Sequence, residues 1–168
     1  MNAEELRAIQ APIKERYKTN PDSGVITLRA QGRAGEGITC KVETGKGVVV
    51  AGLHPATGGN GLAACSGDML LEALVACAGV TLNAVATALG IELRDAELKA
   101  EGELDFRGTL GISKETPVGF KAIKLEFVLD TDASEEQLAT LMKLTERYCV
   151  VYQTLKNPPP ISASRKAA

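Results

Sequence analysis

The segment from Ser66 to Gly90 is the feature that most constrains the fold of this 168-residue chain. Ser66 is of a type that caps helices, Asp68 falls where a first turn would lie, and Gly90 suits the left-handed residue that ends a helix. The pattern predicts a helix over 68–89. Its centre is apolar around nearly the whole circumference, whereas a surface helix is apolar on one side only. We therefore expect this helix to pass through the core.

Sheet-forming segments precede the long helix. The stretches 25–30, 38–42 and 47–51 are rich in residues that favour strands, and glycine-containing turns separate them. Three such strands in succession predict an antiparallel meander. The next stretch, 53–61, is so rich in glycine that we expect a loop.

Two further strands follow the long helix. They are predicted over 92–106 and 120–129, with a hairpin through 108–119. In the second strand apolar side chains alternate with charged ones, which predicts one face toward the core and one toward solvent. The expected inward positions are Ile123, Leu125, Phe127 and Leu129.

A second helix is predicted where Ser134 and Gln137 form a capping-box pattern. Cys149 lies at its end, and the segment 150–163 is expected to be a turn followed by a short edge strand. The expected buried positions of this helix are Leu138, Leu141, Met142 and Tyr148.

A polar helix is predicted at the N-terminus over 2–18, with Pro12 in its interior. We divide the chain into an N-terminal helical extension, 1–20, and a single domain, 21–168. The order of elements predicts an α+β fold with antiparallel sheet.

Charge and composition disfavour several classes of function. Nineteen Lys and Arg residues balance twenty-one Asp and Glu residues, with no long run of either sign, so no nucleic-acid-binding surface is expected. The longest apolar stretch, 73–88, is interrupted by Thr81, Asn83 and Thr87, and no basic segment followed by an apolar one opens the chain. We expect neither a membrane span nor an export signal, and a cytoplasmic location.

Four cysteines are too few and too scattered for a disulfide-stapled scaffold, and we expect free thiols: Cys40, Cys65, Cys77 and Cys149. No two of them form a C-x-x-C pair, and His54 is the one histidine, so neither a metal site nor a cofactor is expected. Taken alone, each cysteine is explained as a small core residue.

Two segments around these cysteines resemble a known family. The run 68–77, Asp-Met-Leu-Leu-Glu-Ala-Leu-Val-Ala-Cys, follows a Gly-Gly loop, and Glu146-Arg147-Tyr148-Cys149 comes some seventy residues later, before Thr154-Leu155. The pattern is similar to the OsmC/Ohr superfamily of osmotically inducible and organic hydroperoxide resistance proteins, in its OsmC-like branch. The resemblance runs from about 25 to 161, and the N-terminal helix looks like an extension found in some branches.

This resemblance implies a fold in which antiparallel sheets surround a long buried central helix, with two protomers intertwined as a homodimer. It implies a thiol-dependent peroxidase that reduces organic hydroperoxides, with Cys77 as the attacking thiol and Cys149 as the resolving one. Arg33, in the glycine-rich turn 31–35, and Asp68, where the family usually has Glu, would complete the site. A dithiol reductant of the lipoyl type is also implied.

The chemistry of thiols is consistent with those roles. A thiolate attacks a peroxide oxygen, and a cysteine buried in an apolar helix has a raised pKa unless a cation or hydrogen-bond donors stabilise its charge. A guanidinium donates to thiolate and peroxide together, and a carboxylate fixes its orientation. The sulfenic acid that forms is then captured by a second thiol.

Two other classes remain open. A hot-dog-fold thioesterase also wraps a sheet around a long helix, and Gly58-Gly59 followed by Asp68 is similar to its acidic catalytic region; it needs no cysteine. A non-catalytic binder of apolar ligands would need a pocket but no reactive thiol. That pocket would be mainly aliphatic, because the chain has no Trp, three Phe and three Tyr.

Overall fold

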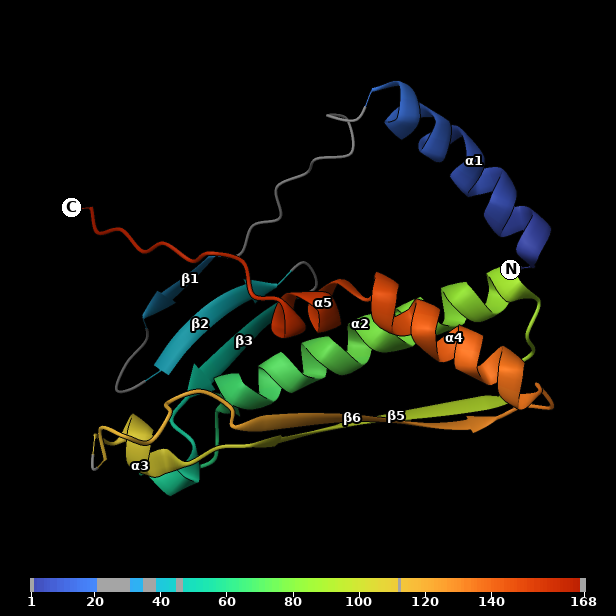
Figure 1. Cartoon of the computed structure of the whole chain (residues 1–168). Coiled ribbons are helices and arrows are strands. Elements are labelled where there is room, and N and C mark those ends of the chain that lie inside the picture. Colours follow the sequence, from blue (N-terminus) through green and yellow to red (C-terminus); the bar gives the residue numbers. More distant parts are fainter. Residues whose placement is uncertain (1, 21–30, 35–38, 45–46, 112, 167–168) are drawn as a thin grey trace.

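The computed structural model describes residues 2–20, 31–34, 39–44, 47–111 and 113–166, with the backbone alone for 9, 13, 14, 16–18, 31–34 and 39–44. The long helix α2 (Ser66–Leu89) crosses the middle of the molecule. The strands β5 (Asp95–Glu103) and β6 (Ala122–Asp130) cover one side of it, and the helices α4 (Glu135–Tyr148) and α5 (Val150–Lys156) cover another (Figure 1). The arrangement is α+β, as predicted.

The helix α2 begins two residues before its predicted start. Cys65 is the N-cap, without a side-chain capping bond, so the expected capping role of Ser66 is wrong and Ser66 is the first helical residue. Gly90 ends the helix at φ 70°, as predicted, and its N–H bonds to carbonyls of the last turn.

The side chains of α2 are buried along one stripe only. The stripe repeats every four residues and consists of Leu74, Ala78, Leu82 and Ala86. Val80, on another side, is 73% exposed, so within one chain the helix is not enclosed all round as expected. The reason is that one pair of strands and one pair of helices leave part of its circumference uncovered.

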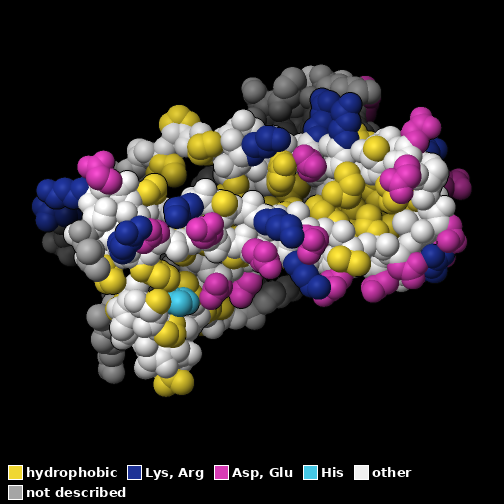
Figure 2. All heavy atoms as spheres, turned by 60° about the horizontal axis from the view of Figure 1, so that its bottom comes forward, with side chains coloured by type: hydrophobic (Ala, Val, Ile, Leu, Met, Phe, Trp, Pro, Cys, Tyr) yellow, Lys and Arg dark blue, Asp and Glu magenta, His cyan; other side chains and the backbone are white. Residues whose placement is uncertain are grey.

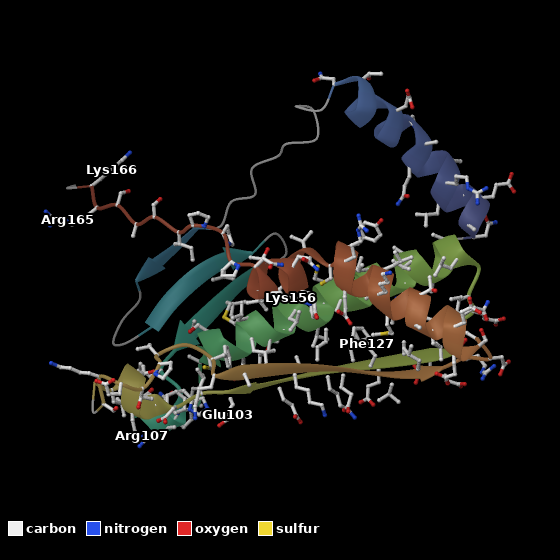
Figure 3. All side chains as sticks on the ribbon, viewed as in Figure 1. Glu103, Arg107, Phe127, Lys156, Arg165 and Lys166 are labelled. Atoms are coloured by element: carbon white, nitrogen blue, oxygen red, sulfur yellow. The ribbon has the colours of Figure 1, made fainter. Side chains whose placement is uncertain are left out.

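The strands β5 and β6 form an antiparallel pair in which Asp95 lies opposite Asp130 and Glu103 opposite Ala122. Burial alternates along both strands, which confirms the predicted inward face of β6. Phe127 points from the sheet toward the helices (Figure 3) and packs against the core cluster around Leu82 and Leu141. The inward face of this pair therefore forms one wall of the core.

The outward face of the β5–β6 pair carries charges of both signs (Figure 2). Lys99 and Glu97 lie 3.0 Å apart, and Lys124 and Glu126 lie 3.1 Å apart. Exposed pairs of this kind contribute little to stability, but they make the face suitable for solvent.

A four-stranded sheet in the order β1-β2-β3-β4 lies at one end of α2 (Figure 1). The strands β1 (Gln31–Ala34), β2 (Thr39–Thr44) and β3 (Gly47–Gly52) form the predicted antiparallel meander. The strand β4 (Ala64–Cys65) pairs with β3 in parallel, which departs from the expectation of purely antiparallel sheet.

The first described strand of this sheet lies where the sequence predicts a turn. The predicted segment 25–30 lies outside the described residues. Gln31–Ala34, predicted as part of a turn, forms β1 because its backbone pairs with β2, with Arg33 opposite Lys41. A glycine in a short segment favours a turn in isolation, but here pairing with β2 determines the conformation.

The helix α4 begins with the predicted capping box. The Ser134 hydroxyl accepts from the Gln137 N–H, and the Gln137 side chain accepts from the Ser134 N–H. Leu141 is fully buried as expected, but Tyr148 is 58% exposed, so its predicted burial is wrong. The buried stripe that faces α2 ends with Thr145 and Cys149 instead.

The segment after Cys149 forms the helix α5, so the predicted turn and edge strand are wrong there. Cys149 restarts the helix because its sulfur accepts the N–H of Tyr152. Asn157 is the C-cap of α5, and the three prolines that follow it cannot continue the helix. The segment 158–166 has no regular structure.

Three shorter or peripheral elements complete the described chain. The helix α1 (Ala3–Thr19) confirms the predicted N-terminal helix, keeps Pro12 in its interior and contacts α2. A 3-10 turn, η2 (Pro55–Thr57), lies in the glycine-rich loop, and α3 (Phe106–Thr109) lies between β5 and β6.

By length and apolar composition, α2 would pass as a membrane-spanning helix. The core helix of a soluble protein satisfies the same two criteria, so this similarity decides nothing about a membrane.

Candidate thiol site

The fold brings Cys77 and Cys149 together. Cys77 lies in the middle of α2, and Cys149 lies between α4 and α5, both of which pack on α2. The two thiols lie close enough for each to shift the pKa of the other. Cys77 is half-buried, whereas Cys149 is 1% exposed.

Cys149 is held by the ends of two helices. Its N–H donates to the Thr145 carbonyl at 3.0 Å and ends α4, while its carbonyl accepts from the Gln153 N–H at 2.9 Å. Its sulfur accepts from the Tyr152 N–H at 3.5 Å and caps α5. These bonds aim the sulfur inward, toward α2.

The surroundings of Cys77 favour its thiolate. Burial raises the pKa of the Cys77 thiol, but the N–H of Val151, the Cys149 thiol and the N–H of Val150 outweigh it, so the pKa lies below its ordinary value. The Thr81 hydroxyl makes the smallest contribution to this lowering of the Cys77 pKa. Because its one proton is donated to the Cys77 carbonyl at 2.8 Å, we assign the lowering to the two N–H groups and the thiol.

The pKa of Cys149 shifts the other way. Burial raises it most, the Tyr152 N–H opposes that rise, and the neighbouring Cys77 raises it further. Of the two thiols, Cys77 therefore ionises first and Cys149 keeps its proton. A nucleophilic thiolate beside a protonated thiol is the arrangement that a two-cysteine redox site requires.

Asp68 is not brought to this pair within one chain. It lies exposed in the first turn of α2, nine residues before Cys77. Nine residues advance a helix by about 13 Å and turn it by about half a revolution beyond two full turns, so the two side chains leave α2 on opposite sides.

Arg33 lies on β1, in a strand and not in the turn where it was expected. Its side chain is outside the described residues, so the structure leaves its relation to Cys77 untested.

Several groups near the thiols were missed by the sequence analysis. Glu146 accepts a hydrogen bond from the Tyr152 hydroxyl at 3.0 Å, and the N–H groups of Val150 and Val151 lie near enough to Cys77 to lower its pKa. Backbone donors have no residue-type signal. The position of Thr81, one turn after Cys77 on the same helix face, was a signal that could have been used.

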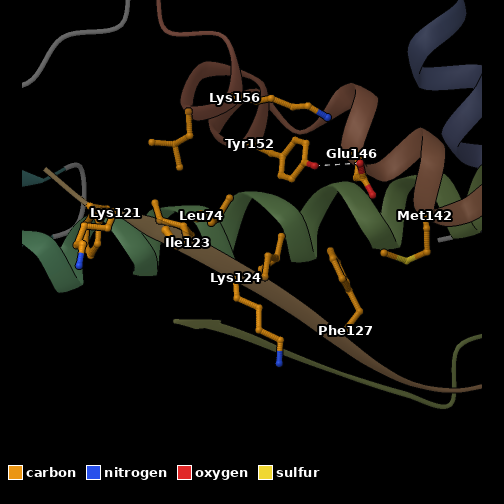
Figure 4. Close-up of a pocket in the computed structure, with 13 residues that line it drawn as sticks. Leu74, Lys121, Ile123, Lys124, Phe127, Met142, Glu146, Tyr152 and Lys156 are labelled. Carbon is orange, nitrogen blue, oxygen red and sulfur yellow. Dashed lines mark hydrogen bonds between the residues drawn. The ribbon is translucent and has the colours of Figure 1, made fainter. Parts of the chain in front are cut away.

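An apolar groove of about 670 Å³ lies between β6 and the helices α4 and α5 (Figure 4). Neither cysteine lines the groove, but two lining residues are close to them: Leu74 lies about one turn of α2 before Cys77, and the Tyr152 N–H is bonded to the Cys149 sulfur. Its polar lining consists of Glu146, Tyr152 and three lysines: Lys121, Lys124 and Lys156. Its lining residues include Leu74, Phe120, Ile123, Leu125, Phe127, Met142 and Leu155.

The remaining candidates carry less chemistry. Cys65 is half-buried at the start of α2, and the side chain of Cys40 is outside the described residues. Within the part of the chain that the structure describes, no three potential metal ligands cluster.

Comparison with known proteins identifies the family. The model of the OsmC-like protein family matches residues 58–164, which include both thiols of the pair, and this chain therefore belongs to that family. The family match favours the OsmC-like fold over the hot-dog fold. A search of curated protein sequences finds no match.

Solved structures agree on the fold. An OsmC-like protein from Mycoplasma pneumoniae has a TM-score of 0.66 at 17% identity, over 79% of this chain and 89% of the other. An organic hydroperoxide resistance protein, OsmC, from Legionella pneumophila has a TM-score of 0.60 at 21% identity, over 80% of this chain and 92% of the other. The organic hydroperoxide resistance protein OhrB of Bacillus subtilis has a TM-score of 0.53 at 21% identity, over 79% of this chain and 93% of the other. At these identities the likeness concerns the fold.

Proposed function

We propose that this protein is a thiol-dependent peroxidase that reduces organic hydroperoxides. The observation that carries the proposal is the adjacency of two thiols with opposite pKa shifts, Cys77 lowered and Cys149 raised. A site with one thiolate and one protonated thiol separates the roles of attacking and resolving cysteine. Membership of the OsmC-like family supports the same chemistry.

The proposed reaction has two chemical steps. The Cys77 thiolate attacks the terminal peroxide oxygen, the O–O bond breaks, and the alkoxide takes a proton and leaves as the alcohol. Cys77 becomes a sulfenic acid. The Cys149 sulfur then attacks the Cys77 sulfur, water leaves, and a Cys77–Cys149 disulfide forms. A dithiol reductant, of the lipoyl type by family resemblance, returns both thiols by exchange.

Arg33 and Asp68 are the proposed supporting residues. A guanidinium at Arg33 would stabilise both the thiolate and the departing oxygen. Because Asp68 leaves α2 on the side opposite Cys77, a role for it in the site requires a second copy of the chain.

A homodimer is therefore part of the proposal. It is supported by exposed apolar side chains on α2 and near the thiols, such as Val80 and Val150. The β5–β6 sheet also supports it, because two strands are too few for a sheet to be stable alone. We further propose a cytoplasmic location, because cycling thiols need a reducing compartment.

The experiment that tests the function compares two serine variants. With an alkyl hydroperoxide and a dithiol reductant, Cys77→Ser should lower peroxide consumption by about a thousandfold or more, because the attacking thiolate is gone. Cys149→Ser should consume one equivalent and then stall as the sulfenic acid or an over-oxidised form. Unimpaired turnover by both variants would refute the proposal.

A non-catalytic binder of apolar ligands is the second candidate, and the 670 Å³ groove is the observation that favours it. Such a protein would bind a saturated alcohol in the groove yet leave a hydroperoxide intact. The serine variants would then match the wild type in binding.

A further inference from the structure

The joint between α4 and α5 is held by side-chain bonds as well as by its backbone. The Tyr152 hydroxyl on α5 donates to the Glu146 carboxylate on α4 at 3.0 Å (Figure 4). The Gln153 side chain donates to the Glu146 carbonyl at 2.8 Å. Glu146 and Tyr152 are both half-buried, so water competes less for their bond than at an exposed site. These bonds tie the last turn of α4 to α5 across Cys149.

The joint carries the donors that face Cys77. Val150 and Val151 are the first residues of α5, where backbone N–H groups have no partner within the helix and are available to another acceptor. The Val150 side chain is 68% exposed and does little to anchor this backbone. The direction of both N–H groups therefore depends on how α5 is fixed to α4.

Resting on the proposed function, we propose that Glu146 and Tyr152 are positioning residues, which fix the α4–α5 joint so that the N–H groups of Val150 and Val151 stay directed at the Cys77 sulfur. Neither side chain is among the main contributors to the pKa of Cys77. They act through the backbone between them. If either Glu146 or Tyr152 is replaced, the α4–α5 joint can shift, and the Cys77 thiolate then loses the N–H donors of Val150 and Val151.

The charge of Glu146 makes the direction of the Cys77 pKa change informative when Glu146 is replaced. A carboxylate near Cys77 disfavours a second negative charge, so removing it should lower the Cys77 pKa if charge alone matters. A positioning role predicts instead that the Cys77 pKa rises when Glu146 is removed. The direct contributors to the Cys77 pKa are burial and the neutral groups of Val150, Val151, Cys149 and Thr81, of which only Cys149 titrates. The charged and titratable groups around the joint are Glu146, Arg147, Tyr152 and Lys156.

The test measures how fast iodoacetamide alkylates Cys77 as a function of pH, in the reduced full-length protein without peroxide, read by peptide mass. At one pH unit below the wild-type midpoint, Tyr152→Phe and Glu146→Ala should each react about three- to tenfold more slowly, which corresponds to a midpoint raised by about half to one unit. Glu146→Gln keeps an acceptor oxygen but loses the charge, so its midpoint should not rise above that of the wild type. The double variant Y152F/E146A should be no slower than either single variant, because both remove one bond.

Thr154→Ala is the matched control, since Thr154 is exposed on the same short helix, and its profile should equal that of the wild type. Thermal unfolding followed by circular dichroism identifies any variant that fails to fold; if Glu146→Ala does, Tyr152→Phe and Glu146→Gln decide. An unchanged or lowered midpoint in Tyr152→Phe, or a midpoint raised above that of the wild type in Glu146→Gln, overturns the positioning role. Hydroperoxide that leaves wild-type Cys77 unoxidised would instead overturn the proposed function, which the alkylation profile does not test.

Discussion

At the scale of single residues, two identical side chains acquire different chemistry from their surroundings. Cys77 gains N–H donors from a neighbouring helix start, whereas Cys149 is almost fully enclosed and lies beside the group that ionises first. The difference arises from placement, since the same thiol in water has one ordinary pKa.

This contrast predicts selective alkylation. Between the two midpoints Cys77 is a thiolate and Cys149 a thiol, so iodoacetamide should modify Cys77 faster, with a rate that falls as pH decreases through the lowered Cys77 pKa. Differential labelling with isotopically distinct reagents and peptide mass spectrometry measures both rates. Equal rates across the pH range, or faster labelling of Cys149, would contradict the assignment.

Arg33 provides a second prediction at this scale. Arg33→Ala should raise the apparent Cys77 pKa and slow hydroperoxide reduction at neutral pH by about tenfold, because a thiolate loses a cationic partner. Arg29→Ala is the matched control and should change much less, because Arg29 belongs to the predicted strand 25–30 and fits the arginine position of the family motif less well than Arg33. Stopped-flow measurement of the first oxidation step checks both variants, and the reverse order of effects would move the role to Arg29.

Sequence reasoning at this scale depended on the resemblance to a family. Cys77 and Cys149 were singled out by a motif and were otherwise explained as core thiols, and nothing in their immediate neighbours signalled that they would meet. The donors from Val150 and Val151 could not be predicted, since they belong to the backbone of a helix that was expected to be a turn and a strand. That helix begins because the sulfur of Cys149 caps it, which is an unusual capping side chain.

At the scale of elements, local patterns predicted what local forces decide. Alternation located β6, the Ser134–Gln137 box located the start of α4, and Gly90 located the end of α2. The position of β1 was missed because pairing with β2 overrode the turn tendency of its glycine, and the parallel β3–β4 contact depends on a loop that returns across the sheet.

The α2–α4 contact predicts where stability is concentrated. Leu141 is fully buried against the core cluster, so Leu141→Ala should lower the free energy of unfolding by about 2–5 kcal/mol through lost burial and a cavity. Lys143→Ala, at an exposed position of the same helix, is the control and should change it by about 0.5 kcal/mol or less. Urea unfolding followed by circular dichroism compares them, and a similar loss in both would refute this account of the core.

At the scale of the whole molecule, the single chain leaves much apolar surface uncovered. Val80 and Tyr148 are mostly exposed beside a hollow of about 520 Å³ between α1, α2 and α4, and the long β5–β6 pair stands alone as a two-stranded sheet. Such surfaces usually mark an interface. The sequence expectation that α2 is enclosed all round is thus met only if another surface covers it.

A second copy of the chain is the proposed cover. Light scattering at micromolar concentration should give about twice the 17.6 kDa mass of the chain. Val80→Asp should shift the equilibrium toward the monomer, because an interface core disfavours an unpaired charge, whereas Ile161→Asp on the extended C-terminal segment should not. A wild-type monomer would reject the homodimer and, with it, the proposed role of Asp68.

The most direct test of the central claim is the fate of each cysteine after the fully reduced protein receives one equivalent of an alkyl hydroperoxide. After remaining thiols are blocked and the protein is digested without reduction, mass spectrometry should find the peptides of Cys77 and Cys149 joined by a disulfide, with Cys65 and Cys40 blocked as free thiols. The alcohol should appear in equal amount. Unconsumed hydroperoxide, or oxidation spread over all four cysteines, would contradict the account.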